Sequence, residues 1–128
     1  GQPWKTQYWT SYIMDSLYTS QIDGLSGNED CGQMSAWYIF SSLGFYPVNP
    51  VSLTYQIGSP QFEEIAIDVA GEQDFAITTD NLGPDNPYIQ SATLNGKPLE
   101  RSYLRHSEIM AGGNLHFVMG PEPNEDLW

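Results

Sequence analysis

The sequence is poor in basic residues: four lysines and arginines stand against sixteen aspartates and glutamates, giving a formal net charge of −12. Phosphate backbones and anionic membrane surfaces are bound through basic side chains. We therefore expect neither nucleic acid nor a membrane as a partner. The acids are scattered rather than gathered in one block, which is typical of a solvated surface and leaves cations or neutral polyhydroxylated ligands as compatible partners.

Cysteine is nearly absent and long apolar runs are missing. Cys31 is the only cysteine, so no internal disulfide can form, and we expect it to be a buried small side chain. No run approaches the ~18 apolar residues that span a bilayer. The 128 residues suit one domain. Because the chain opens on "GQPWKTQYW", without Met, we expect a piece of a longer protein.

The first 46 residues have apolar side chains at helical spacing. The stretch "PWKTQYWTSYIMDSLY" predicts a helix from about Pro3 to Thr19, with its aromatic face packed in the core. A second helix is expected from about Gly32 to Leu43, capped by Asn28 or Asp30. That helix is apolar nearly all round, so it should be buried on every side, partly by helices outside this chain.

The period changes to two after "GFYPVNP". Strands are predicted in "LTYQIGS", "EIAIDVAG", "DFAITTD", "YIQSATL" and "NLHFVMG", with a turn at Gly71 and Glu72 and a hairpin at "NGK". The end, "PEPNEDLW", is expected to fray. The predicted fold class is α+β: terminal helices over residues 1–46, then a small antiparallel sheet or sandwich segment of about six strands over residues 47–128.

The loop "GNED" places two adjacent carboxylates before the second helix. Like charges repel unless a cation, a helix N-terminus or water offsets them. One interpretation is a helix cap with a solvated neighbour. The other is a general base, which needs an ionised carboxylate held by its partners and open to a cleft.

Several long motifs resemble glycoside hydrolase family 92, a family of calcium-dependent exo-acting α-mannosidases. The resemblance runs over nearly the whole chain and is carried by "GQPWKTQYW", "DGLSGNEDCGQMSAWYIFSSLGFYPV", "YQIGSP", "YIQSATLNGKPL" and "SYLRHSEIMAGGNLHFVMG". It implies a C-terminal fragment whose two helices end an (α/α)6 barrel that joins a β-sandwich domain. It also implies an inverting enzyme that removes terminal α-linked mannose from glycans, usually α-1,2-linked, in a secreted or periplasmic location in bacteria.

The resemblance also assigns roles to residues. It implies that Asp30 is the general base that activates water, with Glu29 in support, and that Asn28 and Glu29 contribute to calcium binding. Some family members carry an acid where this chain has Asn28. The residues expected to contact substrate are Gln2, Trp4, Lys5 and Gln7.

An inverting enzyme needs two carboxyl groups about 6.5 to 9.5 Å apart, and adjacent side chains seldom face one another across a sugar. The general acid must therefore come from elsewhere. The resemblance implies that it lies upstream of this chain, which by itself should then be inactive. Exposed apolar surface would then pack against upstream domains, or form a dimer of the fragment. The alternative is a non-catalytic carbohydrate-binding or structural β module of a larger secreted protein.

Overall fold

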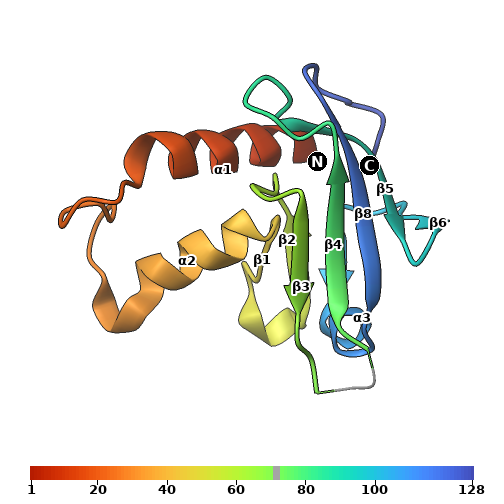
Figure 1. Ribbon diagram of the computed structural model, residues 1–128, viewed down its shortest axis with the longest axis horizontal. Coiled ribbons are helices and arrows are strands. Elements are labelled where there is room, and N and C mark those ends of the chain that lie inside the picture. Colours follow the sequence, from red (N-terminus) through yellow and green to blue (C-terminus); the bar gives the residue numbers. More distant parts are fainter. Residues whose placement is uncertain (71–72) are drawn as a thin grey trace.

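The computed structural model describes residues 1–70 and 73–128. Helix α1 (Pro3–Leu17) is joined by a loop and the short turn η1 (Asp30–Gly32) to α2 (Gln33–Ser42), which runs back alongside α1, next to two β-sheets (Figure 1). The remaining elements are β1 (Phe45–Tyr46), η2 (Pro50–Ser52), β2 (Thr54–Ile57), β3 (Glu64–Ile67), β4 (Phe75–Asp80), β5 (Tyr88–Leu94), β6 (Lys97–Pro98), β7 (Tyr103–Arg105), α3 (His106–Met110) and β8 (Gly113–Gly120). The α+β class is confirmed.

The strands form one sheet in the order β1-β2-β7 and a second in the order β3-β4-β8-β5-β6. The two-residue turn Asn95–Gly96 has positive φ at both positions, which explains the predicted hairpin between β5 and β6. The predicted partners β3 and β4 pair antiparallel, while their connection at Gly71 and Glu72 lies outside the described residues.

Two features of the sheets differ from the prediction. The described residues contain eight strands, whereas about six were predicted. The sequence did not reveal β1, β6 and β7, because they are too short to show a period of two. In addition, β4 and β8 pair parallel, from Phe75 opposite Gly113 to Asp80 opposite Val118, so the region is not wholly antiparallel. Antiparallel neighbours can be joined by a tight turn, whereas a parallel pair brings together strands distant in sequence.

The core is built mainly from the strands of both sheets, with Ile109 of α3. Alternate residues of the central strands point into it, and the side chains with almost no exposure include Phe75, Ile77, Ile89, Leu115 and Phe117. Helix α2 joins this core through Phe40 and Leu43. The strand β1 follows α2 directly and pairs with β2, so the helical and sheet regions are continuous across residue 46. The predicted division of the chain at that residue stays a prediction.

The aromatic face of α1 is not in the core, contrary to the prediction. The buried face of α1 carries Gln7 and Met14. Tyr8, Trp9 and Tyr12 are exposed, pack on one another with ring centroids 5.1 to 6.3 Å apart, and define what we call the α1 aromatic patch. Buried Gln7 accepts a hydrogen bond from the Ile89 amide at 3.0 Å, so a polar contact with β5 orients the helix.

Helix α2 is also only partly covered. Its side facing the sheet buries Ser41 and Ser42, whereas Ile39 is 58% exposed. Among the described residues, no element covers that side, so the expected all-round burial is not met within this chain. No helix in the described part of the chain has the length and hydropathy required to cross a membrane.

The C-terminal residues do not fray. The Trp128 indole N–H donates to the Leu99 carbonyl at 2.6 Å, and Asn124 donates to the Gln90 carbonyl at 3.0 Å. Leu127 and Trp128 pack against the core. The apolar pair at the end of the chain therefore outweighs the proline and acidic residues that suggested a loose tail.

Candidate functional site

The acidic loop has an unusual backbone path. Cys31 (φ 54°) and Gly32 (φ 81°) are both left-handed, so the chain reverses between Asp30 and the start of α2. Glycine adopts this conformation freely, whereas a side chain such as that of cysteine is strained in it. Cys31 is exposed, and the prediction of a buried cysteine is wrong because this reversal turns its side chain outward.

Glu29 fixes the reversed loop onto α2. Its carboxylate accepts hydrogen bonds from both the backbone N–H of Ser35, at 3.0 Å, and the Ser35 hydroxyl. We call this pair the Glu29–Ser35 clamp. The first turn of a helix has free N–H groups and a positive dipole end, so a carboxylate there is stabilised. The prediction that Asn28 or Asp30 caps α2 is wrong, because Gly32 occupies the N-cap position and Glu29 satisfies the free amide.

Asp30 is left open to solvent by this arrangement. It is exposed, and the described residues offer its side chain no hydrogen-bond partner. One carboxylate of the adjacent pair is thus tied to the helix, while the other can accept a proton from a water molecule. A general base also needs partners that hold it and a cleft that it faces, so the role of Asp30 stays a prediction.

A tyrosine borders the clamp. The pKa of Tyr18 is raised, mainly by burial and to a smaller extent by the nearby Glu29 carboxylate and by Tyr46. Its hydroxyl therefore stays protonated at neutral pH. The hydroxyl is buried and has no hydrogen-bond partner in the described part of the chain. Tyr18, Ser35 and Tyr38 line a cavity of about 380 Å³ next to the clamp. Sequence reasoning missed both Tyr18 and Ser35; a serine in the first turn of the predicted helix was the available signal for the latter.

The predicted calcium ligands form only part of a coordination shell. Calcium takes six to eight oxygen ligands. Both carboxylate oxygens of Glu29 already accept from Ser35, while Asn28 is exposed. Within residues 1–70 and 73–128, no three His, Cys, Asp or Glu side chains gather as metal ligands would. The residues present do not fit a complete calcium site.

The predicted substrate residues lie apart from the acidic loop. Gln2, Trp4 and Lys5 are at the start of α1, and the loop follows its end, so the two groups are at opposite ends of the helical hairpin (Figure 1). A helix of 15 residues is about 22 Å long. One sugar ring cannot touch both ends.

Their local contacts also matter. The Lys5 ammonium lies 5.0 Å from the Trp4 ring centroid and occupies one face of the indole. Gln7 is 2% exposed and uses its carbonyl oxygen on β5. The expected sugar contact of Gln7 is left without support, while Gln2 and Lys5 are exposed and their role stays a prediction.

Comparison with known proteins defines the class. A solved inverting mannosidase of family GH92 from Bacteroides thetaiotaomicron is 46% identical, covers 98% of this chain and matches it with a TM-score of 0.91. A second GH92 α-mannosidase from that organism is also 46% identical, covers 97% of this chain and has a TM-score of 0.90. A protein of Arthroderma benhamiae described as a secreted glycosidase is 35% identical over 119 residues, or 88% of this chain.

These relatives are glycoside hydrolases. The family model described as the glycosyl hydrolase family 92 catalytic domain matches residues 1–121. The chain belongs to glycosyl hydrolase family 92. It spans 17% of the length of each of the two solved mannosidases and 15% of the Arthroderma protein.

Proposed function

We propose that this chain supplies the water-activating part of an inverting exo-α-mannosidase, with Asp30 as general base. The observation that carries the proposal is the division of labour in the loop: Glu29 is held by Ser35, and Asp30 is open to solvent. The two related Bacteroides structures, an inverting mannosidase and an α-mannosidase, support the substrate class and the stereochemistry.

The chemistry follows from the exposed carboxylate. Asp30 accepts a proton from water as that water attacks the anomeric carbon, and the bond to the leaving sugar breaks on the opposite face. A carboxylic acid across the sugar, about 6.5 to 9.5 Å from the base, must protonate the leaving oxygen. Glu29 is committed to Ser35 and adjacent to Asp30, so it cannot be that acid. We infer that the acid lies outside these 128 residues and that the chain alone is inactive.

Calcium remains part of the proposal with a smaller role for this chain. The exposed side-chain oxygen of Asn28 is the ligand that the loop can offer, while both oxygens of Glu29 are already hydrogen-bonded. A bound calcium ion would contact neighbouring hydroxyls of the sugar and help to distort its ring. The other ligands would come from outside this chain.

The biological setting is proposed from the same relatives. We infer an α-1,2-mannosidase acting on mannose-containing glycans, and a secreted or periplasmic location that the secreted Arthroderma relative supports. The exposed α1 aromatic patch favours packing against other parts of the polypeptide. Exposed aromatic rings would also suit the alternative, an autonomous carbohydrate-binding module, but the uncovered apolar Ile39 of α2 argues against a module that folds by itself.

The test uses the chain joined to the upstream part of its polypeptide, assayed on α-1,2-mannobiose with and without a chelator. Asp30→Asn should lower kcat by about 10² to 10⁴, the usual loss for a general base. Asp68→Asn, which removes an exposed carboxylate outside the loop, is the matched control and should retain full activity. Wild-type activity in Asp30→Asn would refute the assignment.

A further inference from the structure

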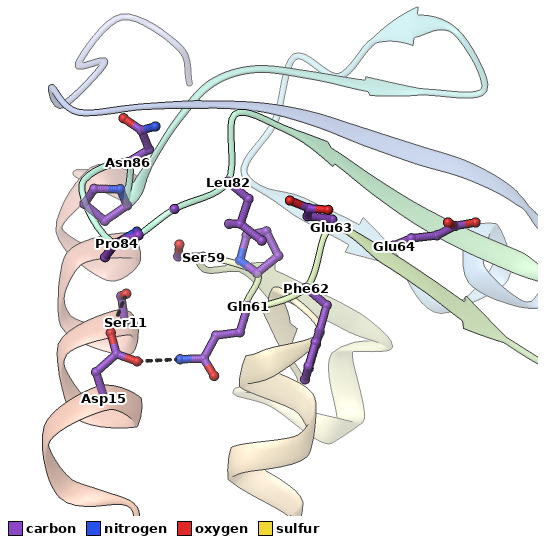
Figure 2. A pocket seen from close by; sticks show the side chains of 13 residues that line it. Ser11, Asp15, Ser59, Gln61, Phe62, Glu63, Glu64, Leu82, Pro84 and Asn86 are labelled. Carbon is purple, nitrogen blue, oxygen red and sulfur yellow. Dashed lines mark hydrogen bonds between the residues drawn. The ribbon is translucent and has the colours of Figure 1, made fainter.

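A second cavity, larger than the one beside the clamp, opens between α1 and two loops of the sheet region. Its volume is about 700 Å³, within the range of small-molecule sites. Figure 2 shows Ser11 and Asp15 of α1 on one side, the segment containing Gln61 opposite, and Pro84 and Asn86 at the end. None of these residues belongs to the acidic loop.

The walls of this cavity are held in place by hydrogen bonds. Gln61 donates to the Asp15 carboxylate at 2.9 Å, which ties α1 to the loop before β3 (Figure 2). The backbone N–H of Gln61 also donates to the Ser42 carbonyl at the end of α2. Asn86 donates from its side chain to the Asn81 carbonyl at 2.8 Å, which closes the loop between β4 and β5. The cavity is therefore largely formed before any ligand arrives, and preformed sites lose less entropy on binding.

The lining combines polar groups with a rigid apolar surface. The carboxylate of Asp15, the hydroxyl of Ser11 and the amides of Gln61 and Asn86 supply donors and acceptors, while Leu82 and several prolines provide nonpolar surface. Sugars match such a lining, because hydroxyls pair with carboxylates and amides while ring C–H groups pack on nonpolar atoms.

The charges of the lining decide between ligand classes. Lysine, arginine and histidine do not line the cavity in the described part of the chain, whereas three carboxylates do: Asp15, Glu63 and Glu64. A phosphate or a uronate would be repelled. The Asp15 carboxylate already accepts from Gln61, and Glu63 and Glu64 point away from it (Figure 2), so the three do not converge on a cation.

We propose that this cavity binds a neutral sugar unit of a glycan, as a binding site separate from the acidic loop. The choice of mannose as the sugar rests on the proposed function; the existence of the site does not. Asp15 is the anchoring acceptor, and its carboxylate and the amide of Gln61 contact the sugar hydroxyls, while Asn86 lines the far end of the cavity. A glycan held there would raise the local concentration of further mannose residues near the protein.

The test is a titration of the ¹⁵N-labelled chain with α-1,2-mannobiose, followed by NMR. The side-chain NH₂ signals of Gln61 and Asn86 report directly from the cavity walls. We expect both to shift and to saturate with a dissociation constant of about 1 mM. Asp15→Asn should weaken binding about tenfold through loss of a charged acceptor, whereas Asp68→Asn, the matched charge-removing control, should bind as wild type.

Two further ligands test the chemical class. Glucuronate and choline should leave both amide signals in place, because one is an anion and the other lacks the set of hydroxyls. Unmoved Gln61 and Asn86 signals with mannobiose, equal affinity in Asp15→Asn, or stronger binding of choline than of the sugar would each overturn the proposal. Glucose binding as strongly as mannose would keep the site and overturn only the choice of mannose. Hydrolysis by the longer polypeptide is read separately through Asp30, so failure of one proposal is distinguishable from failure of the other.

Discussion

Replacing Glu29 by alanine should destabilise the protein through loss of the Glu29–Ser35 clamp. The side chain accepts two hydrogen bonds from Ser35 in a partly buried position at the first turn of α2. A hydrogen bond to a charged group contributes about 1.5 to 3 kcal/mol, and removing a helix cap costs about 0.5 to 2 kcal/mol. These figures describe the same contacts, so they are not added. We expect a loss of about 2 kcal/mol in the free energy of unfolding.

The neighbouring substitutions grade this effect. Glu29→Gln keeps an acceptor but loses the charge, and should cost about 1 kcal/mol. Ser35→Ala keeps the backbone N–H donor but loses the hydroxyl, and should also cost about 1 kcal/mol. Asp30→Ala is the matched control: the residue is exposed and adjacent, so its replacement should change stability by less than about 0.5 kcal/mol.

The assay is urea unfolding followed by circular dichroism, with thermal unfolding as a second measurement. For a chain of this size a loss of 2 kcal/mol lowers the Tm by about 8 °C. A double-mutant cycle between Glu29 and Ser35 should show a coupling of about 1 kcal/mol. If Glu29→Ala and Asp30→Ala were equally harmless, the clamp would not hold the loop and the reasoning would fail.

Three other predictions concern the loop, the pH dependence and the exposed helix. Cys31→Gly should stabilise the protein by about 0.5 to 1 kcal/mol in urea unfolding, because Cys31 has φ 54°; a loss of stability would contradict the strain. Burial favours a raised pKa for Glu108, but hydrogen bonds from the Arg105 amide and the Arg101 guanidinium, with both arginine charges, outweigh burial and lower it. The stabilisation by Glu108 is therefore present above its unfolded pKa of about 4.5 and is lost as the pH falls through the lower folded pKa. Glu108→Gln should flatten the acid side of a profile of unfolding free energy against pH. An unchanged acid side would exclude this role for Glu108. Trp9 is 54% exposed in the α1 aromatic patch, so we expect light scattering to show that the isolated chain forms a dimer. Trp9→Glu should make the chain monomeric and leave its Tm unchanged. A dimer that survives the substitution would place the interface elsewhere.

The local features of the fold were predictable from sequence. The alternation in "EIAIDVAG" and "DFAITTD" identified β3 and β4, and the Asn95–Gly96 pair identified a hairpin, because each depends on neighbouring residues. The parallel pairing of β4 with β8 depends on contacts between segments far apart in the chain. Periodicity does not encode such pairings.

The orientation of α1 shows a second limit. Helical spacing defined two faces, and the more aromatic one was assigned to the core. The structure buries the other face, because Gln7 finds a partner in the Ile89 amide 82 residues away. A polar side chain can enter the core only where such a partner exists, and the sequence alone does not show the partner.

In the acidic loop, the division into one held and one open carboxylate was predictable, but the geometry was not. Adjacent carboxylates before a helix indicated that one would be held and the other open. Which one was held depended on the left-handed path at Cys31 and Gly32, which carries Glu29 to the Ser35 amide rather than leaving Asp30 as the cap. The separation of Gln2 and Lys5 from the acidic loop follows from the length of α1, which the helical spacing already predicted.

The most direct test of the central claim follows the stereochemistry of hydrolysis in the chain joined to its upstream polypeptide. With Asp30 as general base, NMR should detect β-mannose as the first product from an α-mannoside. Asp30→Ala should lose hydrolysis, and azide, which needs no deprotonation, should restore turnover with β-mannosyl azide as product. Formation of α-mannose first, or of α-mannosyl azide in the variant, would contradict the assignment of Asp30 as the residue that activates water.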